Sequence, residues 1–176
     1  MQNFGITSPF ILIPVAILLS TFAGFVNGTL LTRLDLPHPF VSTLGMKNVL
    51  WGVALLITSS KTIGFTNKGV DSTLWIGRAT FDINIFGIEL LTGFPVSFIL
   101  VLVVYVIFHV FLNHTALGRQ IYCVGGNPEA ARLSGIRSKD VLTVVYMISG
   151  FMCGLAGVVL AGRLNTANTA SAATYD

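Results

Sequence analysis

The segment Gly118–Asp140, GRQIYCVGGNPEAARLSGIRSKD, is a polar stretch between two highly apolar segments of the chain. Within it, Asn127 is a favourable N-cap residue, Pro128 suits the first helical position, and Gly135 can end a helix in the left-handed conformation. These signals frame a helix of about two turns, far shorter than the roughly 12–15 residues that an isolated helix needs in water. We therefore predict that another molecule holds this helix, and a soluble partner with a groove for it is the expected support.

The same stretch resembles the cytoplasmic coupling loop of the permease subunits of bacterial ABC importers for ribose, galactose, xylose and related sugars. In that family a Gly-Gly-Asn precedes a short Ala-rich helix that ends in Ser-Gly-Ile, which Gly125-Gly126-Asn127 and the EAARLSGI of residues 129–136 match. The resemblance implies that the helix engages a separate ATPase. The alternative is a solvated surface helix that only joins two spans. The implied ATPase-coupling residues are Gly126, Asn127, Pro128, Glu129, Ala130, Ala131, Arg132, Leu133, Ser134 and Gly135.

Within this set, the chemistry of the side chains suggests a division of roles. Glu129 and Arg132 would make polar contacts at the groove of the ATPase, while Ala130, Ala131 and Leu133 would supply a small, close-fitting surface. Glu129 also places negative charge at the positive end of the helix dipole.

The composition indicates an integral membrane protein. Of 176 residues, 53% are apolar and only 10% are charged, and the mean hydropathy is +0.82, which is typical of chains that span a bilayer. The formal net charge is +3, but the basic residues form no run or patch interleaved with aromatic residues, so a nucleic-acid partner is not expected.

Apolar runs long enough to cross the hydrocarbon layer predict an all-α, polytopic transmembrane helix bundle of about four spans. The predicted spans cover residues 9–31, 39–58, 94–112 and 141–162. Residues 59–93 would then form an external loop, and residues 113–140 the cytoplasmic coupling loop. The alternation FDINIFGI over residues 81–88 predicts either a small hairpin strand or apolar side chains on the membrane surface.

Two of these spans have small residues at intervals of four, a pattern that lets another helix approach closely. We expect the partners of both faces to come from further segments of a longer permease. The face on the first span is Ser20, Gly24 and Gly28, and the face on the last span is Ser149, Cys153, Gly157 and Ala161, with Gly150 and Gly154 beside it.

The start of the second span, PFVSTLG over residues 39–45, is similar to a Pro-Phe-Ile-Ala-Thr-Leu-Gly segment of the same permeases. Pro37 and Pro39 interrupt the helix before it, and an interrupted helix is tolerated at membrane depth only where protein or a watery cavity covers its backbone. For Asn27, the alternative to a path-lining role is a hydrogen bond that only holds the bundle together. The predicted translocation path consists of Asn27, Phe40, Ser42, Thr43, Gly45 and Asn48.

The count of Lys and Arg on the two sides is nearly even, and the dense basic cluster of the coupling loop together with the family resemblance predicts that this loop lies on the cytoplasmic side. Arg119, Arg132, Arg137 and Lys139 lie in the loop, and basic residues close to span ends favour the inside. Arg33 falls on the same side if every span crosses the membrane.

The sequence has neither the nucleotide-binding phosphate loop GxxxxGK(S/T) nor the zinc-protease motif HExxH. No catalytic or metal-binding residue is therefore predicted. The resemblance implies a multi-pass permease subunit of the bacterial inner (plasma) membrane that translocates a monosaccharide, such as ribose, galactose or xylose. ATP and Mg would bind to the partner ATPase. The other implied partners are a second permease subunit, a periplasmic or extracellular sugar-binding protein and membrane lipid.

Three alternatives remain at the level of sequence. Permeases for nucleosides, autoinducer or branched-chain amino acids have related loops. Because the resemblance covers only the middle of a family member, the chain is expected to be a fragment of a larger permease and could be a truncated remnant that does not transport. An intramembrane enzyme would need paired ionisable residues within spans, and Lys47 and His109 are too far apart in the sequence to be paired.

Overall fold

The computed structural model describes residues 9–34, 38–59, 61–64, 80–85, 88–164 and 166–167. Four helices in these ranges are long and apolar enough to cross a membrane. They are α1 (Pro9–Arg33), α2 (Pro39–Thr58), α4 (Val96–His114) and α7 (Ser138–Leu164). The predicted all-α polytopic bundle is thus confirmed. Most of the predicted 59–93 loop and the polar tail after residue 167 lie outside the described residues.

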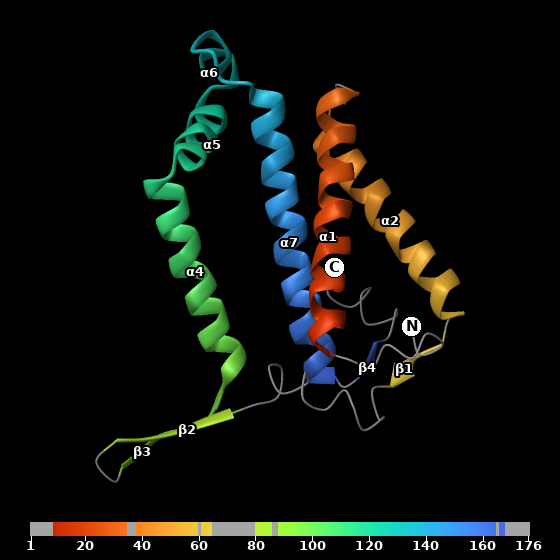
Figure 1. Cartoon of the computed structure of the whole chain (residues 1–176), viewed down its shortest axis with the longest axis vertical. Helices are drawn as coiled ribbons and strands as arrows, with labels where there is room; N and C mark the ends of the chain where they lie inside the picture. Colours follow the sequence, from red (N-terminus) through yellow and green to blue (C-terminus); the bar gives the residue numbers. More distant parts are fainter. Residues whose placement is uncertain are drawn as a thin grey trace.

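The four long helices run alternately up and down between two ends of the molecule (Figure 1). One end, which we call the coupling end, has the short helices α5 (Ala116–Gly126) and α6 (Pro128–Leu133). At this end the last residue of α1 meets the first turn of α7, where Arg33 Nη2 lies 3.9 Å from Asp140 Oδ1. Arg33 is therefore on the same side as the coupling loop, as expected if every span crosses.

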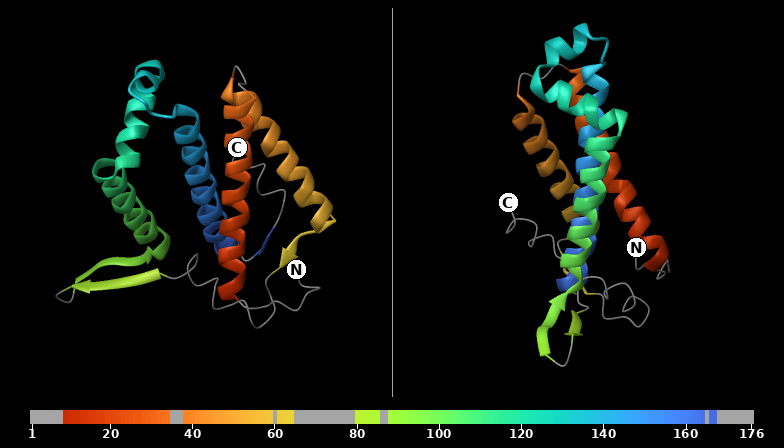
Figure 2. Two further views of the ribbon diagram at one scale, coloured as in Figure 1. Left: turned by 45° about the horizontal axis from the view of Figure 1, so that its top comes forward. Right: turned by 90° about the vertical axis from the view of Figure 1, so that its left-hand side faces the viewer.

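The main tertiary contact of the bundle is between α1 and α7, which lie side by side in both views of Figure 2. The glycines of α1 make this contact possible. A methyl group added at Gly24 would lie 3.0 Å from the Cα of Gly150, and one added at Gly28 would lie 2.9 Å from the Cβ of Tyr146. The predicted close-packing face Ser20, Gly24 and Gly28 is therefore confirmed, and its partner is a helix of the same chain.

The face predicted for α7 is confirmed for Gly150 and Gly154, which lie beside its stripe, and is wrong for the stripe itself. Gly150 and Gly154 make the close approach to α1, whereas Ser149, Cys153 and Gly157 are exposed. The expectation that the partners of these faces come from elsewhere is wrong for the two faces that meet here, because α1 and α7 are each other's partner. Glycine permits this approach since it has no Cβ to separate the two backbones.

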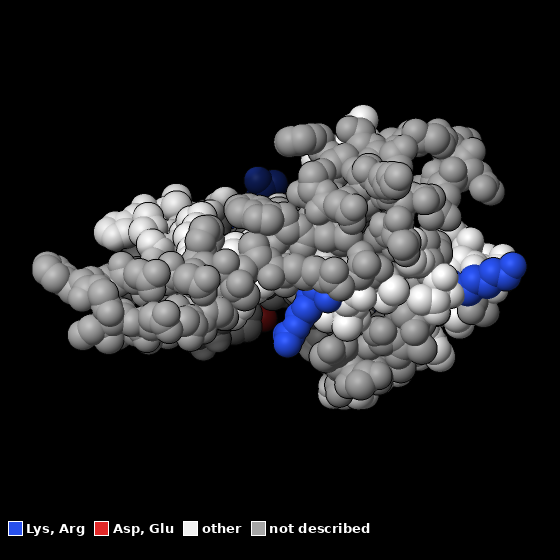
Figure 3. Space-filling model, turned by 90° about the horizontal axis from the view of Figure 1, so that it is seen from below, with Lys and Arg blue, Asp and Glu red and all other residues white. Residues whose placement is uncertain are grey.

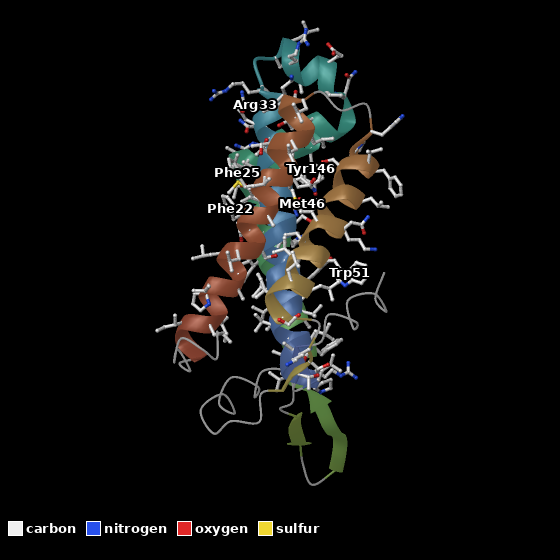
Figure 4. All side chains as sticks on the ribbon, turned by 90° about the vertical axis from the view of Figure 1, so that its right-hand side faces the viewer. Phe22, Phe25, Arg33, Met46, Trp51 and Tyr146 are labelled. Carbon is white, nitrogen blue, oxygen red and sulfur yellow. The ribbon has the colours of Figure 1, made fainter. Side chains whose placement is uncertain are left out.

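The other two long helices pack more loosely against the rest of the molecule. Neither α2 nor α4 has a buried residue. In Figure 4, Met46 lies on the side of α2 nearer α1, while Phe22 and Phe25 project from the opposite side of α1. Phe22 is 63% exposed. The apolar outer surfaces of these helices suit contact with lipid or with other membrane helices.

Short strands lie at the other end of the molecule, which we call the strand end. β2 (Thr80–Ile85) pairs with β3 (Ile88–Pro95), and β1 (Ile63–Gly64) pairs with β4 (Thr166–Ala167), both antiparallel. The hairpin predicted around residues 81–88 is confirmed, with residues 86–87 outside the described residues. On this face the described Lys and Arg side chains that can be seen stand apart from one another (Figure 3).

Candidate coupling surface and interhelical polar contacts

The first turn of α6 is capped as the sequence predicts. The side-chain oxygen Oδ1 of Asn127 accepts hydrogen bonds from the backbone N–H groups of Glu129 and Ala130, each 3.1 Å long. Pro128 occupies the first helical position, where its missing N–H removes no bond. The start of this helix is therefore determined by two adjacent residues, Asn127 and Pro128.

The end of α6 is a Schellman motif. Gly135 has a φ of +82°, and its N–H donates to the carbonyl of Arg132 over 3.0 Å. The N–H of Ile136 donates to the carbonyl of Ala131, also over 3.0 Å. This pair of bonds satisfies carbonyls that the helix leaves free, so the predicted left-handed stop at Gly135 is confirmed.

The support for α6 comes from the chain itself. Ala131 is only 4% exposed and forms the small apolar core of the coupling end with Val124 of α5 and Val141 of α7. Ile121 and Ile136 pack against this core. The prediction that another molecule must hold α6 is therefore wrong, because the helix buries its inner side against α5 and α7. Ala131 faces this core and not the outer surface of the helix.

Sequence reasoning missed α5. Its N-cap is Thr115, whose Oγ1 accepts from the N–H of Gly118 over 3.0 Å and donates to the carbonyl of Phe111 over 2.7 Å. A methyl group added at Gly118 would overlap the carbonyl of Leu112, so the corner between α4 and α5 requires glycine. The available signal was the spacing of three apolar residues of α5 by four and then three positions, Leu117, Ile121 and Val124.

The outer side of α6 is exposed. Leu133 is 87% exposed, the largest exposed fraction among the large hydrophobic residues that the structure describes. Glu129, Ala130 and Arg132 are exposed beside it. We call these four residues the α6 surface. An exposed leucine that shares a helix surface with an acidic and a basic side chain is suited to insertion into an apolar pocket with a polar rim. Gly126, Asn127, Pro128, Ser134 and Gly135 are also exposed.

Two of the predicted path residues meet. The hydroxyl of Ser42 on α2 donates to Oδ1 of Asn27 on α1 over 2.8 Å, and both side chains are half-buried. Gly45 and Asn48 are exposed and follow Ser42 at steps of three along α2. Phe40 and Thr43 lie on other sides of this helix, because each residue advances about 100° around the axis. The structure does not bring these two residues to Asn27.

The predicted break before the second span ends at Pro39. From there α2 is a regular helix, and the hydroxyl of Thr43 donates to the carbonyls of Pro39 and Phe40 in its own first turn. Since α1 ends at Arg33 and α2 begins at Pro39, the predicted break between the first two spans is confirmed, with residues 35–37 outside the described residues.

Polar groups also join α1 to α7 at the coupling end. The hydroxyls of Thr32 and Thr143 are 3.1 Å apart, and Thr32 is buried. Close to these hydroxyls, the carboxylate of Asp140 forms an ion pair with Arg33 of α1 at 3.9 Å and another with Arg137, just before α7, at 3.4 Å. These ion pairs are largely exposed, so each contributes at most about 1 kcal/mol. The pair between Arg33 and Asp140 connects the end of α1 to the first turn of α7, next to α6.

Comparison with known proteins places this arrangement in a family. The family described as branched-chain amino acid transport system/permease component matches residues 1–175. The chain belongs to this permease family.

Curated relatives of this family member are sugar permeases. The chain is 34% identical to the fructose import permease of Rhizobium meliloti over 151 residues, and this match covers 81% of the chain and 38% of that permease. The chain is 37% identical over 146 residues to the D-allose transport system permease of Escherichia coli K12, a match that covers 82% of the chain and 40% of that permease. The chain is 32% identical over 150 residues to the ribose import permease of Bacillus subtilis, a match that covers 85% of the chain and 43% of that permease. The resemblance to sugar permeases is thus confirmed.

The chain therefore spans less than half the length of these three relatives. No solved structure matches it. Membership in a family of permease components, together with four apolar helices long enough to cross a bilayer, makes the chain a multi-pass membrane protein.

Proposed function

We propose that the chain forms the membrane-spanning part of an ABC importer permease that translocates a monosaccharide across the bacterial inner membrane, driven by a separate ATPase subunit that docks on the α6 surface. The names of the relatives support the sugar, since they are permeases for fructose, allose and ribose. ATP and Mg bind to the partner ATPase in this proposal. The other proposed partners are a second permease subunit, an extracellular or periplasmic sugar-binding protein and the surrounding lipid.

The observation that best supports docking is the exposure of Leu133 on a helix that is already held from inside. Because Ala131 packs against Val124 and Val141, α6 presents Leu133 in one orientation before any partner arrives. A preorganised surface loses less conformational entropy on binding than one that folds on contact. Asn127 and Gly135 fix the two ends of this surface.

Leu133→Glu tests the docking directly. The substitution places a charge where an apolar pocket of the ATPase would receive a leucine, and it leaves the core of the coupling end intact. We expect loss of co-purification with the cognate ABC ATPase and loss of permease-stimulated ATP hydrolysis. Leu34→Glu is the matched control, because Leu34 is 62% exposed at the same end of the bundle but outside α6. Full ATPase association of Leu133→Glu would contradict docking at α6.

The proposed path follows the contact between α1 and α2. The line of proposed path residues starts at the hydrogen-bonded pair Asn27 and Ser42 and includes Phe40, Thr43, Gly45 and Asn48 on other sides of α2. A carboxamide and a hydroxyl can exchange hydrogen bonds with the hydroxyl groups of a sugar. Uptake of labelled sugar by a permease with Asn48→Leu, compared with Val49→Leu as the control, tests this line.

The family description favours a second class of solute. It names branched-chain amino acids, so uptake of a branched-chain amino acid in place of a sugar is the alternative to be measured. Thermal-shift measurements on the cognate binding protein with both classes of solute distinguish them, because that protein presents the solute to the permease.

A further inference from the structure

We infer that one face of the α1–α7 pair binds an anionic phospholipid from the membrane leaflet at the coupling end. We call it the lipid face, and its residues are Phe22, Phe25, Arg33, Arg137, Asp140 and Phe151. The inference rests on the proposed function only for the contact with lipid, which it narrows to one chemical class and one site. It needs neither the ATPase nor the sugar.

The polar part of the lipid face is a pair of guanidinium groups that share one carboxylate. Arg33 Nη2 lies 3.9 Å from Asp140 Oδ1, and Arg137 Nε lies 3.4 Å from Asp140 Oδ2. The two arginine side chains are 74% and 88% exposed, and the single carboxylate leaves one positive charge uncompensated. A guanidinium has five N–H donors in a planar fork that matches the oxygens of a phosphate. This cluster is therefore suited to bind a phosphate group.

The charges of the lipid face lie where the two spans end. Arg33 is the last residue of α1, and Asp140 belongs to the first turn of α7. The headgroups of a bilayer lie at this level, immediately outside the roughly 30 Å hydrocarbon core. A phospholipid with net negative charge is favoured over a zwitterionic one, because its headgroup carries no cation that the guanidinium groups would repel.

The apolar part of the lipid face consists of exposed aromatic residues on both helices. Phe22 and Phe25 precede Arg33 by about three and about two turns, and Phe151 follows Asp140 by about three turns. Residues separated by nearly whole turns lie on one side of a helix, and the ion pair between Arg33 and Asp140 joins that side of α1 to that side of α7. The exposed fractions of the three phenylalanines are 63%, 41% and 39% in chain order.

The length of this apolar part matches one leaflet. Phe22 lies about 16 Å along α1 from Arg33 at 1.5 Å per residue, which is about half of the hydrocarbon core. Figure 4 shows Phe22, Phe25 and Arg33 following one another along α1 toward the coupling end, with α2 on the other side of α1. An acyl chain that starts at a headgroup beside Arg33 therefore extends along exposed aromatic side chains.

Charge complementarity favours a lipid over a second copy of the chain on this face. A second copy in the same orientation would bring its own Arg33 and Arg137 to the same level of the membrane, and juxtaposed like charges oppose association. An anionic headgroup supplies the opposite charge.

Native mass spectrometry of the full chain in detergent tests the selectivity. We expect phosphatidylglycerol to bind about fivefold more tightly than phosphatidylcholine with the same acyl chains, the effect of roughly one basic charge. The double variant Arg33→Gln/Arg137→Gln should lose this preference. The matched control is Arg119→Gln/Arg163→Gln, which removes the same charge at exposed positions outside the lipid face and should retain the preference.

Three results decide the polar part of the site. Unchanged binding of phosphatidylcholine by the Arg33→Gln/Arg137→Gln variant, together with unchanged helical circular dichroism, shows that it is folded. A preference that persists in this variant, or that is lost equally in the control, would overturn the site. Millimolar inorganic phosphate should leave phosphatidylglycerol bound, because free phosphate has no acyl chains; displacement of the lipid would overturn a lipid site in favour of a phosphate site.

Fluorescence quenching in nanodiscs tests the apolar part. Both native tryptophans are replaced by phenylalanine, and Phe22→Trp is introduced as the reporter. The control reporter is Val49→Trp, since Val49 is 60% exposed on α2 and lies about 15 Å from the start of that helix, close to the depth of Phe22. The nanodiscs contain equal amounts of phosphatidylglycerol and phosphatidylcholine, with bromine on the acyl chains of only one lipid.

Brominated phosphatidylglycerol should quench Phe22→Trp more strongly than brominated phosphatidylcholine does, whereas both lipids should quench Val49→Trp equally. Adding Arg33→Gln/Arg137→Gln should abolish the difference at Phe22→Trp. Equal quenching at Phe22→Trp would overturn the inference, and so would a Phe22→Trp reporter that neither lipid quenches, because protein would then cover this face. Loss of lipid selectivity leaves docking at Leu133 untouched, and failure of docking leaves the lipid measurements valid.

Discussion

The hydroxyl of Ser20 on α1 donates a 2.6 Å hydrogen bond to the backbone carbonyl of Gly150 on α7, across 130 positions of sequence. The bond is possible because Gly24 and Gly150 let the two backbones come into contact. Interhelical hydrogen bonds in membranes contribute about 0.6 kcal/mol on average. The packing that surrounds this bond is therefore the larger source of stability for the pair.

Gly24→Leu should separate α1 from α7. Its side chain would overlap the backbone carbonyl of Tyr146, and overpacking of this kind costs typically about 1–3 kcal/mol. We expect a lower thermal unfolding midpoint in detergent. Gly157→Leu is the control, because no described atom lies within 4 Å of a methyl group at Gly157. Equal midpoints for the two variants would show that α1 and α7 do not pack at Gly24.

Ala131→Glu should release α6 from the coupling end. The charged side chain would replace a methyl group that is buried against Val124 and Val141, and an unpaired charge in an apolar site is strongly unfavourable. Faster amide hydrogen exchange across α6, measured without any ATPase, is the expected result. Ala130→Glu, at an exposed position, should leave exchange nearly unchanged. If both variants keep wild-type protection, the helix is not held by this core.

Asn127→Ala should weaken the start of α6. It removes the oxygen that accepts from the N–H groups of Glu129 and Ala130, and loss of such a cap costs about 1 kcal/mol. Exchange of those two amides should accelerate. Asn127→Asp retains an acceptor at the same place and should restore most of the protection; failure to do so would mean that the side-chain oxygen is not the cap.

Gly135→Ala should weaken the end of α6. A φ of +82° is accessible to glycine, and the left-handed conformation costs other residues roughly 1–2 kcal/mol. We expect reduced protection of Gly135 and Ile136, whose N–H groups close the Schellman motif. Gly125→Ala is the comparison, since it lies within α5 with open space around it and a helical glycine is replaced by a better helix former. Similar protection in both variants would exclude a requirement for glycine at position 135.

Some features of this protein could be predicted from sequence because they depend on neighbours along the chain. The caps of α6 at Asn127 and Gly135 belong to this class, since each satisfies backbone groups only a few residues away. The spans do too, because their length and apolar composition are properties of single segments. The helix α5 was missed because its apolar face has only three residues and the helix ends at two glycines.

By itself, the sequence determined that four segments cross a membrane, that a short capped helix lies between the last two, and that α1 has a face suited to close packing. Only the tertiary structure decided that this face meets Gly150 and Gly154 of α7, and not the stripe through Ser149 and Cys153. A stripe at intervals of four turns by about 40° per step around a helix, so the sequence allows either face. Side chains more than a hundred positions apart had to be fitted together before one face could be chosen. The same fitting buried Ala131 and left Leu133 exposed.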